Sequence, residues 1–317
     1  MYKYALRRTL YMIPILFGIS IITFILFNVA GGDPALQLAG KSATKEQIEE
    51  LRKELGLSGS YLEQYGFYVK QIVTMDFGRS WSTKQKISQM IFGESLADSP
   101  VLVSMSLTFP AFFITLMLSI CIALLVTFFR GTVFDKTVMV ISLSAISISS
   151  LVYILYLQYG LGYSLGLFPI SGWDPGWLER WSYLAMPIII FVALTLGSNI
   201  LFYRTIFMDE IFQDYVRTAR AKGLDNKKIM FKHVLRNAMI PIITLVVLQV
   251  PFLITGTLLI ESFFSIPGLG GLIWQAVNNS DFPVIKAFTV ISAIVYMIFQ
   301  LISDLLYAVV DPKVQLR

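Results

Sequence analysis

The residues most able to carry out chemistry are few in this chain. It holds one histidine, His233, and one cysteine, Cys121, which lies within an apolar run. A zinc site of the Cys/His type needs several such ligands, and a lone cysteine in an apolar run is ordinarily a small buried hydrophobe. A membrane-embedded enzyme would need a base beside its nucleophile, whereas His233 falls in a charged segment away from the serines of the apolar runs. The sequence therefore disfavours an enzyme and predicts no metal site.

What the chain offers instead is charge, concentrated in residues 204–238. The segment carries eight basic residues against four acidic ones: Arg204, Arg217, Arg220, Lys222, Lys227, Lys228, Lys232 and Arg236 against Asp209, Glu210, Asp214 and Asp225. Cytoplasmic loops of membrane proteins retain Lys and Arg. The segment is therefore a candidate contact surface on the inner side of a membrane.

The pattern of this charged segment predicts an elbow. Few helix breakers occur from Phe207 to Lys222, and Gly223 can end that helix with a positive φ. Asp225 can cap a second helix, Asn226 to about Asn237. Pro241 is suited to the start of the next apolar run, where its missing N–H matters least. We expect a helix, a glycine turn and a short helix leading into a membrane span.

Two interpretations of the elbow stay open on its residues alone. A basic amphipathic elbow can lie against anionic lipid headgroups, which attract Lys and Arg. Alternatively, Ala219, Ala221 and Gly223 are small, and small residues around a turn let the backbone of another protein approach closely. The second interpretation makes the elbow a docking ridge.

The elements that position this elbow are long apolar runs. Of the 317 residues, 56% are hydrophobic and 14% charged, whereas about 25% charged residues is usual in soluble domains. Because a helix needs about 20 apolar residues to cross a bilayer, we predict six spans: Leu10–Ala30, Val101–Phe129, Thr137–Tyr159, Tyr183–Tyr203, Met239–Phe263 and Val284–Val310. None alternates with a period of two, which disfavours a membrane β-barrel. The expected fold class is an all-α polytopic membrane protein with six transmembrane helices.

Charge also predicts the orientation of the spans. Lys3, Arg7 and Arg8 precede the first run and place the N-terminus inside. Alternation through six spans then puts residues 204–238 and the tail inside, so both termini are cytoplasmic. The first run is longer than the apolar region of a cleaved signal peptide, about 7–15 residues, and we expect it to be retained. The net charge of +5 is explained by this placement, and no nucleic-acid partner is predicted.

The chain divides into three parts on this basis. They are residues 1–30 with the first span, an extracytoplasmic segment 31–100, and a five-helix core 101–317 that contains the loop 204–238. Within the second part, Thr44–Gln47 and Ser60–Glu63 have the pattern of capping boxes, and Gly56 is a plausible helix stop. We expect two or three short helices lying over the outer face of the bundle.

Several motifs resemble one family along nearly the whole chain. The segment from Asp214 to Pro241, DYVRTARAKGLDNKKIMFKHVLRNAMIP, resembles the cytoplasmic loop of ABC importer permeases, most of all the B-type permease of the dipeptide/oligopeptide/nickel branch. Further segments are similar to motifs of that branch: GDPA at 32–35, DFGRS at 76–80, FPISG at 168–172, ESFFSIPGLG at 261–270, DFPV at 281–284 and LYAVVDP at 306–312. Six such segments in register make the resemblance specific.

The resemblance implies a fold, a role and partners. It implies the type I importer permease fold, with the elbow as a coupling helix that sits in a groove of a partner ATPase. The residues implied to couple are Asp214, Tyr215, Arg217, Thr218, Ala219, Arg220, Ala221, Lys222, Gly223 and Leu224. It further implies two ATPase subunits, a second C-type permease, an extracytoplasmic solute-binding protein, and a place in a bacterial or archaeal cytoplasmic membrane. The chain has no GxxxxGK[ST] phosphate loop, so we expect it to bind no cofactor and its partners to use ATP and Mg²⁺.

The chain departs from the branch at a few positions. In the loop of the wider family, a glutamate occupies the position of Arg217. This branch commonly departs from the family there in the same way. Gly31 and Ser149 stand where the branch usually has proline, and Leu201 where many members have arginine. A typical substrate range should therefore not be assumed.

Polar residues inside spans usually face protein or water, which gives candidates for the translocation pathway. They are Ser147, Ser149, Gln158, Asn199, Gln249 and Thr255, with Asn199 and Gln249 preferred. Each can instead bond within its own helix or join two helices. Glu261 and Asp281, near the outer ends of spans five and six, are candidate contacts for the binding protein, and Glu261 could also be a structural partner in its loop.

The expected function is that of a permease subunit forming half of the pathway for short peptides. The absence of mid-span charge suits a weakly polar, unselective path. The alternative within the branch is a nickel or metallophore permease, and a channel or scaffold that moves nothing actively is a third class.

Overall fold

Helices long enough to cross a membrane make up most of the chain. The computed structural model describes residues 2–30, 34–39, 43–54, 57–95, 99–176 and 178–310. Five helical segments are long and apolar enough to span: Arg7–Val29, Pro100–Phe128, Arg180–Ile211, Asn226–Phe263 and Phe282–Leu305. A sixth is present if the bent pair Val133–Ser147 and Ser150–Ser164 counts as one span. The described residues form no strand beyond one isolated bridge, Arg79 to Lys86, which confirms the all-α prediction.

The elements follow one another in a simple order. They are α1 (Tyr2–Phe24), η1 (Ile25–Ala30), α2 (Pro34–Ala39), α3 (Lys45–Glu54), α4 (Tyr61–Thr74), α5 (Ile87–Phe92), α6 (Pro100–Phe128), α7 (Val133–Ser147), α8 (Ser150–Leu157), η2 (Gln158–Ser164), α9 (Arg180–Ile211), α10 (Asp214–Ala221), α11 (Asn226–Lys228), η3 (Ile229–Val234), α12 (Leu235–Thr255), α13 (Leu258–Phe263), α14 (Leu269–Asn278) and α15 (Phe282–Val310). The elements labelled η have π-helical hydrogen bonding.

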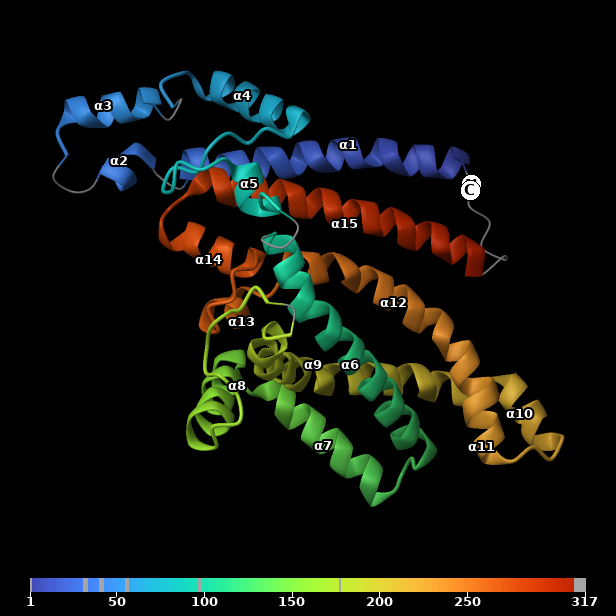
Figure 1. Ribbon diagram of the computed structural model, residues 1–317. Helices are drawn as coiled ribbons and strands as arrows, with labels where there is room; N and C mark the ends of the chain where they lie inside the picture. Colours follow the sequence, from blue (N-terminus) through green and yellow to red (C-terminus); the bar gives the residue numbers. More distant parts are fainter. Residues whose placement is uncertain are drawn as a thin grey trace.

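The bundle is built around the long contact between α6 and α9. Helix α7 packs against α9, α12 packs against α6 and α15, and α1 lies along α15 at one flank (Figure 1). The α10–α11 elbow lies at one end of the bundle, and α2, α3, α13 and α14 gather at the other (Figure 1). Two polar contacts fix α1 and α15 antiparallel: Arg8 to Asp304 at 3.1 Å near one end, and Lys286 to Asn28 at 3.0 Å near the other.

Apolar side chains cover the outside of the bundle. On α1, Leu10, Ile13, Phe17 and Ile22 are each more than half exposed. Water would strongly disfavour such a continuous apolar surface, whereas lipid tails accept it. Composition and surface together indicate a membrane protein.

The third predicted span, Thr137–Tyr159, is not a single straight helix. The chain bends by 95° between α7 and α8, because Ile148 and Ser149 both adopt extended backbone conformations. Ser147 Oγ bonds back to the Leu143 carbonyl at 2.9 Å, a side-chain bond that bends helices. Tyr153 spans the break by donating its hydroxyl to the Ala145 carbonyl at 3.1 Å.

The fifth predicted span, Met239–Phe263, also needs correction, because its helix begins earlier and is interrupted before Phe263. Helical structure runs unbroken from Asn226 to Thr255, and it ends at Gly256, whose φ of +76° suits glycine. A β-carbon at Gly256 would also collide with the side chains of Glu261 and Ser104. The separate helix α13 then covers Leu258–Phe263.

The segment before α6 holds four short helices in its described part, α2 to α5, rather than two or three. Both capping boxes are confirmed: the hydroxyl and amide groups of Thr44 bond reciprocally with Gln47, and those of Ser60 with Glu63. The stop predicted at Gly56 lies outside the described residues.

One of these helices lies where the sequence did not predict it. Helix α4 lies beside α1 rather than over the end of the bundle (Figure 1). The hydroxyls of Ser20 and Tyr65 are 2.9 Å apart, and the rings of Phe17 and Tyr65 pack edge to face. Ser20 precedes Val29 by nine residues, about 14 Å along a helix. Helix α4 therefore lies beside the first span itself, at a level well before the end of that span.

Candidate functional site: the charged elbow and the loops at the opposite end

The elbow begins with a break that the sequence did not predict. The expected helix from Phe207 to Lys222 is interrupted at Phe212 and Gln213, because Gln213 has an extended backbone (φ −68°, ψ 151°). Helix α10 therefore starts afresh at Asp214 and can leave the axis of α9. Tyr215 ties the two helices by donating its hydroxyl to Glu210 at 2.6 Å. Burial and this hydrogen bond raise the pKa of Tyr215 to about 12, so the donor proton is kept at physiological pH.

One face of α10 packs into the bundle. Val216 is fully buried and Ala219 is 6% exposed. They belong to a core cluster that also contains Phe207 of α9, Met230 of η3 and side chains of α6 and α12. The elbow is therefore a seated part of the fold and not a loose loop.

The opposite face of α10 and its turn is open. Tyr215 is half-buried, and the other predicted coupling residues off the packed face are exposed: Asp214, Arg217, Thr218, Arg220, Ala221, Lys222, Gly223 and Leu224. The structure brings the predicted coupling residues together on one elbow. The charged side chains of the exposed part are three basic residues, Arg217, Arg220 and Lys222, and one acidic residue, Asp214.

The glycine turn matches its prediction. Gly223 has a φ of +76°, and the amides of Gly223 and Leu224 donate to the carbonyls of Arg220 and Ala219. A β-carbon at Gly223 would meet nothing within 4 Å, so space beside the turn is free within this chain. Asp225 occupies the predicted N-cap position, but its side chain makes no capping hydrogen bond.

The elbow continues directly into a membrane helix. The predicted second helix does not end near Asn237, and Pro241 lies inside α12 rather than at a helix start. The backbone passes from α11 through the π-helical η3 into α12 without a break. Helix α10 is joined to this continuous helix through the turn at Gly223.

The predicted pathway residues come from several different helices. Ser147 and Thr255 bond back to carbonyls of their own helices, and Ser149 is exposed at the α7–α8 break. Gln158 donates to the carbonyls of Ile170 and Phe263, which joins η2 to the end of α13.

The two preferred pathway candidates differ from the others. Asn199 and Gln249 are half-buried on α9 and α12. Among the described interactions, neither side chain has a hydrogen bond within the chain. Thr255 lines a cavity of about 380 Å³ between α12, α14 and α15, whose lining does not include the other five candidates.

The prediction that Glu261 meets a binding protein is contradicted by its burial. Its side chain is fully buried. Oε1 accepts hydrogen bonds from Ser104 Oγ at 2.9 Å and the Thr257 amide at 2.8 Å, and Oε2 accepts from the amides of Gly270 and Gly271 at 2.7 and 3.2 Å. The carboxylate satisfies the first amides of α13 and α14, which lack partners within their helices. Glu261 is the structural partner of its loop, the other role that the sequence left open for it.

Asp281 is likewise internal, at 1% exposure, so its predicted contact with a binding protein is also contradicted. It accepts hydrogen bonds from Ser80 Oγ and from the amides of Trp81 and Ser82. Two motifs 200 residues apart, DFGRS and DFPV, therefore meet at one carboxylate. The sequence shows each motif but gives no sign of their contact.

Two further polar contacts within the bundle were not predicted from the sequence. Ser104 on α6 donates to Glu261 and accepts from the Leu269 amide at 2.8 Å. Asp135 on α7 pairs with Arg204 on α9 at 2.9 Å. Asp135 is the lone acidic residue between two apolar runs, which is the signal that could have identified it.

The fold and the elbow define a polytopic helical membrane protein that presents a charged helix at one end of its bundle. Residues 116–316 match the model of the family described as binding-protein-dependent transport system inner membrane component, and residues 1–129 match the N-terminal model of such membrane components. The chain belongs to this family of permeases of ABC transport systems.

Curated relatives cover the chain from end to end. The glutathione transport system permease protein GsiC of Shigella flexneri is 31% identical over 317 residues, the whole of both chains. A putative peptide transport system permease protein of Brucella abortus is 32% identical over 316 residues, 98% of each chain. The predicted membrane location and the peptide branch agree with these matches.

Proposed function

We propose that this chain forms half of a translocation pathway for short peptides. It would pair with a second permease, receive solute from an extracytoplasmic binding protein and be driven by two ATPase subunits. The names of the relatives, glutathione and peptide transport permeases, support the substrate class. ATP and Mg²⁺ would be bound by the ATPases.

The single observation that carries this proposal is the two-sided elbow. Helix α10 buries Val216 and Ala219 in the bundle and exposes Arg217, Arg220 and Ala221. A coupling element must be seated on the membrane helices and open to its partner, and α10 meets both conditions. Closure of the ATPases would move α10, and the continuous helix from Asn226 to Thr255 would carry the movement to the opposite end of the bundle.

The proposed orientation follows from the same geometry. The elbow would be cytoplasmic, and α2 to α5, α13 and α14 extracytoplasmic. The binding protein would then dock over the loops that Glu261 and Asp281 hold in place from within. Asn199 and Gln249 remain the proposed polar residues of the pathway.

Solute-stimulated ATP hydrolysis tests the proposal. The chain is purified with the second permease and ATPase subunits encoded beside it, and reconstituted with the neighbouring binding protein. A short-peptide library and nickel chelates are compared in parallel. We expect stimulation by peptides. Stimulation by nickel chelates alone would instead support the metallophore alternative, and no recruitment of ATPase would contradict the importer function.

A further inference from the structure

A lysine on a membrane-spanning helix faces a cavity between α1, α4 and α15. Lys286 lies four residues after the start of α15 and donates from Nζ to Asn28 Oδ1 at 3.0 Å. The ammonium also lies 5.3 Å from the centroid of the Tyr68 ring. The cavity beside it has a volume of about 370 Å³.

The lining of this cavity combines positive charge with aromatic surface. Three basic residues contribute, and no Asp or Glu does. The basic residues are Arg79, Lys84 and Lys286, and aromatic surface comes from residues such as Phe67, Tyr68 and Trp81. A site of this composition favours a ligand with an anionic oxygen group and an apolar part.

The surroundings of Lys286 lack a counter-charge. Among the described residues, no carboxylate lies within ion-pair distance of its ammonium. Asn28 supplies an amide dipole and Tyr68 supplies the face of an aromatic ring. Both stabilise a cation less than a negatively charged partner would. Lys286 is half-buried. Because a partly desolvated ammonium without a counter-charge is unfavourable, the site favours an anion from outside the described residues.

The surroundings of the cavity favour a lipid as the source of that anion. Asn28 is flanked on the first span by Ile25, Leu26 and Val29, whose side chains are each about half exposed. They form an apolar surface for an acyl chain beside the cationic site. Phe67 of α4 is 62% exposed and also lines the cavity, so the cavity has an open apolar rim.

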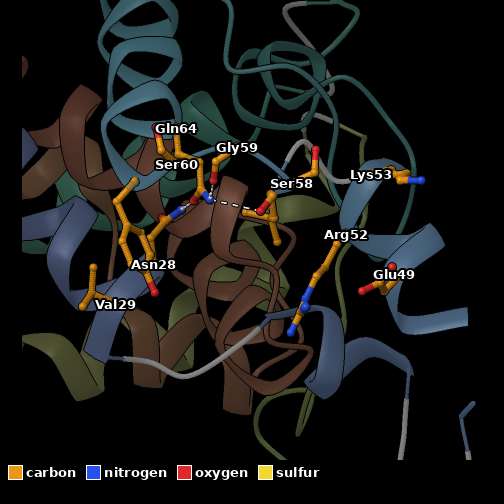
Figure 2. A pocket seen from close by; sticks show the side chains of 11 residues that line it. Asn28, Val29, Glu49, Arg52, Lys53, Ser58, Gly59, Ser60 and Gln64 are labelled. Carbon is orange, nitrogen blue, oxygen red and sulfur yellow. Dashed lines mark hydrogen bonds between the residues drawn. The ribbon is translucent and has the colours of Figure 1, made fainter. Parts of the chain in front are cut away.

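A neighbouring cavity extends the polar side of the site. It has a volume of about 650 Å³ and shares Asn28, Leu57 and Gln64 with the first. Figure 2 shows Asn28, whose side-chain amide donates to Gln64 at 3.1 Å, between α1 and the start of α4. The second cavity offers room for the polar end of a headgroup.

We propose that this site binds the phosphate of an anionic phospholipid, with Lys286 as the main cationic contact. The lipid would fill the space between the first span and α4 and hold them together. The inference is independent of the proposed transport function, since lipid binding is measured without ATPases or solute.

Native mass spectrometry of the full chain in detergent tests this proposal. The protein is titrated with phosphatidylglycerol and, separately, with phosphatidylcholine. We expect a preference for phosphatidylglycerol, and a loss of about five-fold in its affinity in Lys286→Met, the factor that one Lys near a headgroup contributes. Lys70→Met is the matched control, because Lys70 lies exposed on α4 outside the cavity lining; it should bind as wild type.

A second variant keeps the test decisive if Lys286→Met folds poorly. Phe67→Glu places a negative charge on an exposed wall position and should also reduce phosphatidylglycerol binding. Equal binding of the two lipids, or wild-type binding by both variants, overturns the proposal. Displacement of phosphatidylglycerol by an equal concentration of inorganic phosphate would show a free-anion site and overturn the lipid assignment.

Discussion

The guanidinium of Arg204 on α9 donates two hydrogen bonds to the carboxylate of Asp135 on α7, from Nε at 3.0 Å and from Nη2 at 3.1 Å. The Gly131 amide adds a third at 2.9 Å. Asp135 is 6% exposed. This ion pair joins α9, the helix that precedes the elbow, to α7. It therefore helps to fix the position of α9, against which α10 packs.

Arg204→Met should destabilise the bundle. It leaves the carboxylate of Asp135 buried with one remaining donor, and hydrogen bonds to charged groups contribute roughly 1.5–3 kcal/mol each. We expect a loss of about 3–5 kcal/mol, as when one partner of a buried ion pair is removed, measured as a lower apparent Tm of the purified protein in detergent. Arg217→Met is the control, because its contact with Asp214 at 3.5 Å is largely exposed and should contribute little. Equal Tm values for the two variants would contradict this role for the pair.

Glu261→Gln should loosen the turn between α13 and α14. The amide side chain keeps one acceptor oxygen and turns an NH₂ group toward backbone N–H donors, so at least one of the four hydrogen bonds to the carboxylate is lost. A loss of roughly 3 kcal/mol is expected, with faster hydrogen exchange at Gly270 and Gly271. Glu50→Gln, on the exposed surface of α3, should change neither quantity. Unchanged exchange in Glu261→Gln would show that the carboxylate does not hold this turn.

Two glycine substitutions should change the stability of the protein in opposite directions. A β-carbon at Gly268 would collide with Glu261 Oε2 and Ser104 Oγ, whereas one at Gly66 meets nothing within 4 Å. Gly268 has a negative φ, so strain plays no part there. Gly268→Ala should lower the apparent Tm, and Gly66→Ala, inside α4, should raise stability by roughly 0.5–1 kcal/mol. A Gly268→Ala protein with the apparent Tm of the wild type would show that the side chains around Glu261 can shift at little energetic cost.

The turn of the elbow should depend on backbone conformation alone. Gly223→Val places a β-branched residue at a φ of +76°, a conformation that costs about 1–2 kcal/mol for non-glycine residues. Gly223→Asn tolerates this region and should keep the turn. Limited proteolysis between Lys222 and Lys228 measures the difference. Similar cleavage rates for the two variants would exclude strain as the reason for glycine.

The sequence predicts much of this fold because membrane spans are encoded by length and apolarity. The turn at Gly223 was also predictable, since a glycine after a helical pattern is a local signal. The break at Ile148 and Ser149 was not, because a helix tolerates both the serines and the apolar residues around it. The bend depends on bonds such as that of Tyr153 to Ala145, which only the folded chain provides.

The roles of the acidic residues show the same limit. Glu261 and Asp281 stand out in sequence as rare carboxylates near span ends. Their burial depends on Ser104 and Ser80, which are 157 and 201 positions away in the chain. Such contacts follow from tertiary packing, so the sequence could mark the residues but not decide between an exposed and an internal role.

Retention of ATPase subunits by an elbow variant tests the central claim most directly. Ala221 is exposed on α10 and helical, so Ala221→Trp adds bulk to the open face without backbone strain. We predict a stable protein that co-purifies with at least about ten-fold less ATPase, a loss of about 1.4 kcal/mol in binding, while Thr74→Trp on α4 retains ATPase as wild type. Wild-type retention of ATPase by Ala221→Trp, together with wild-type solute-stimulated hydrolysis, would contradict the elbow as the docking site.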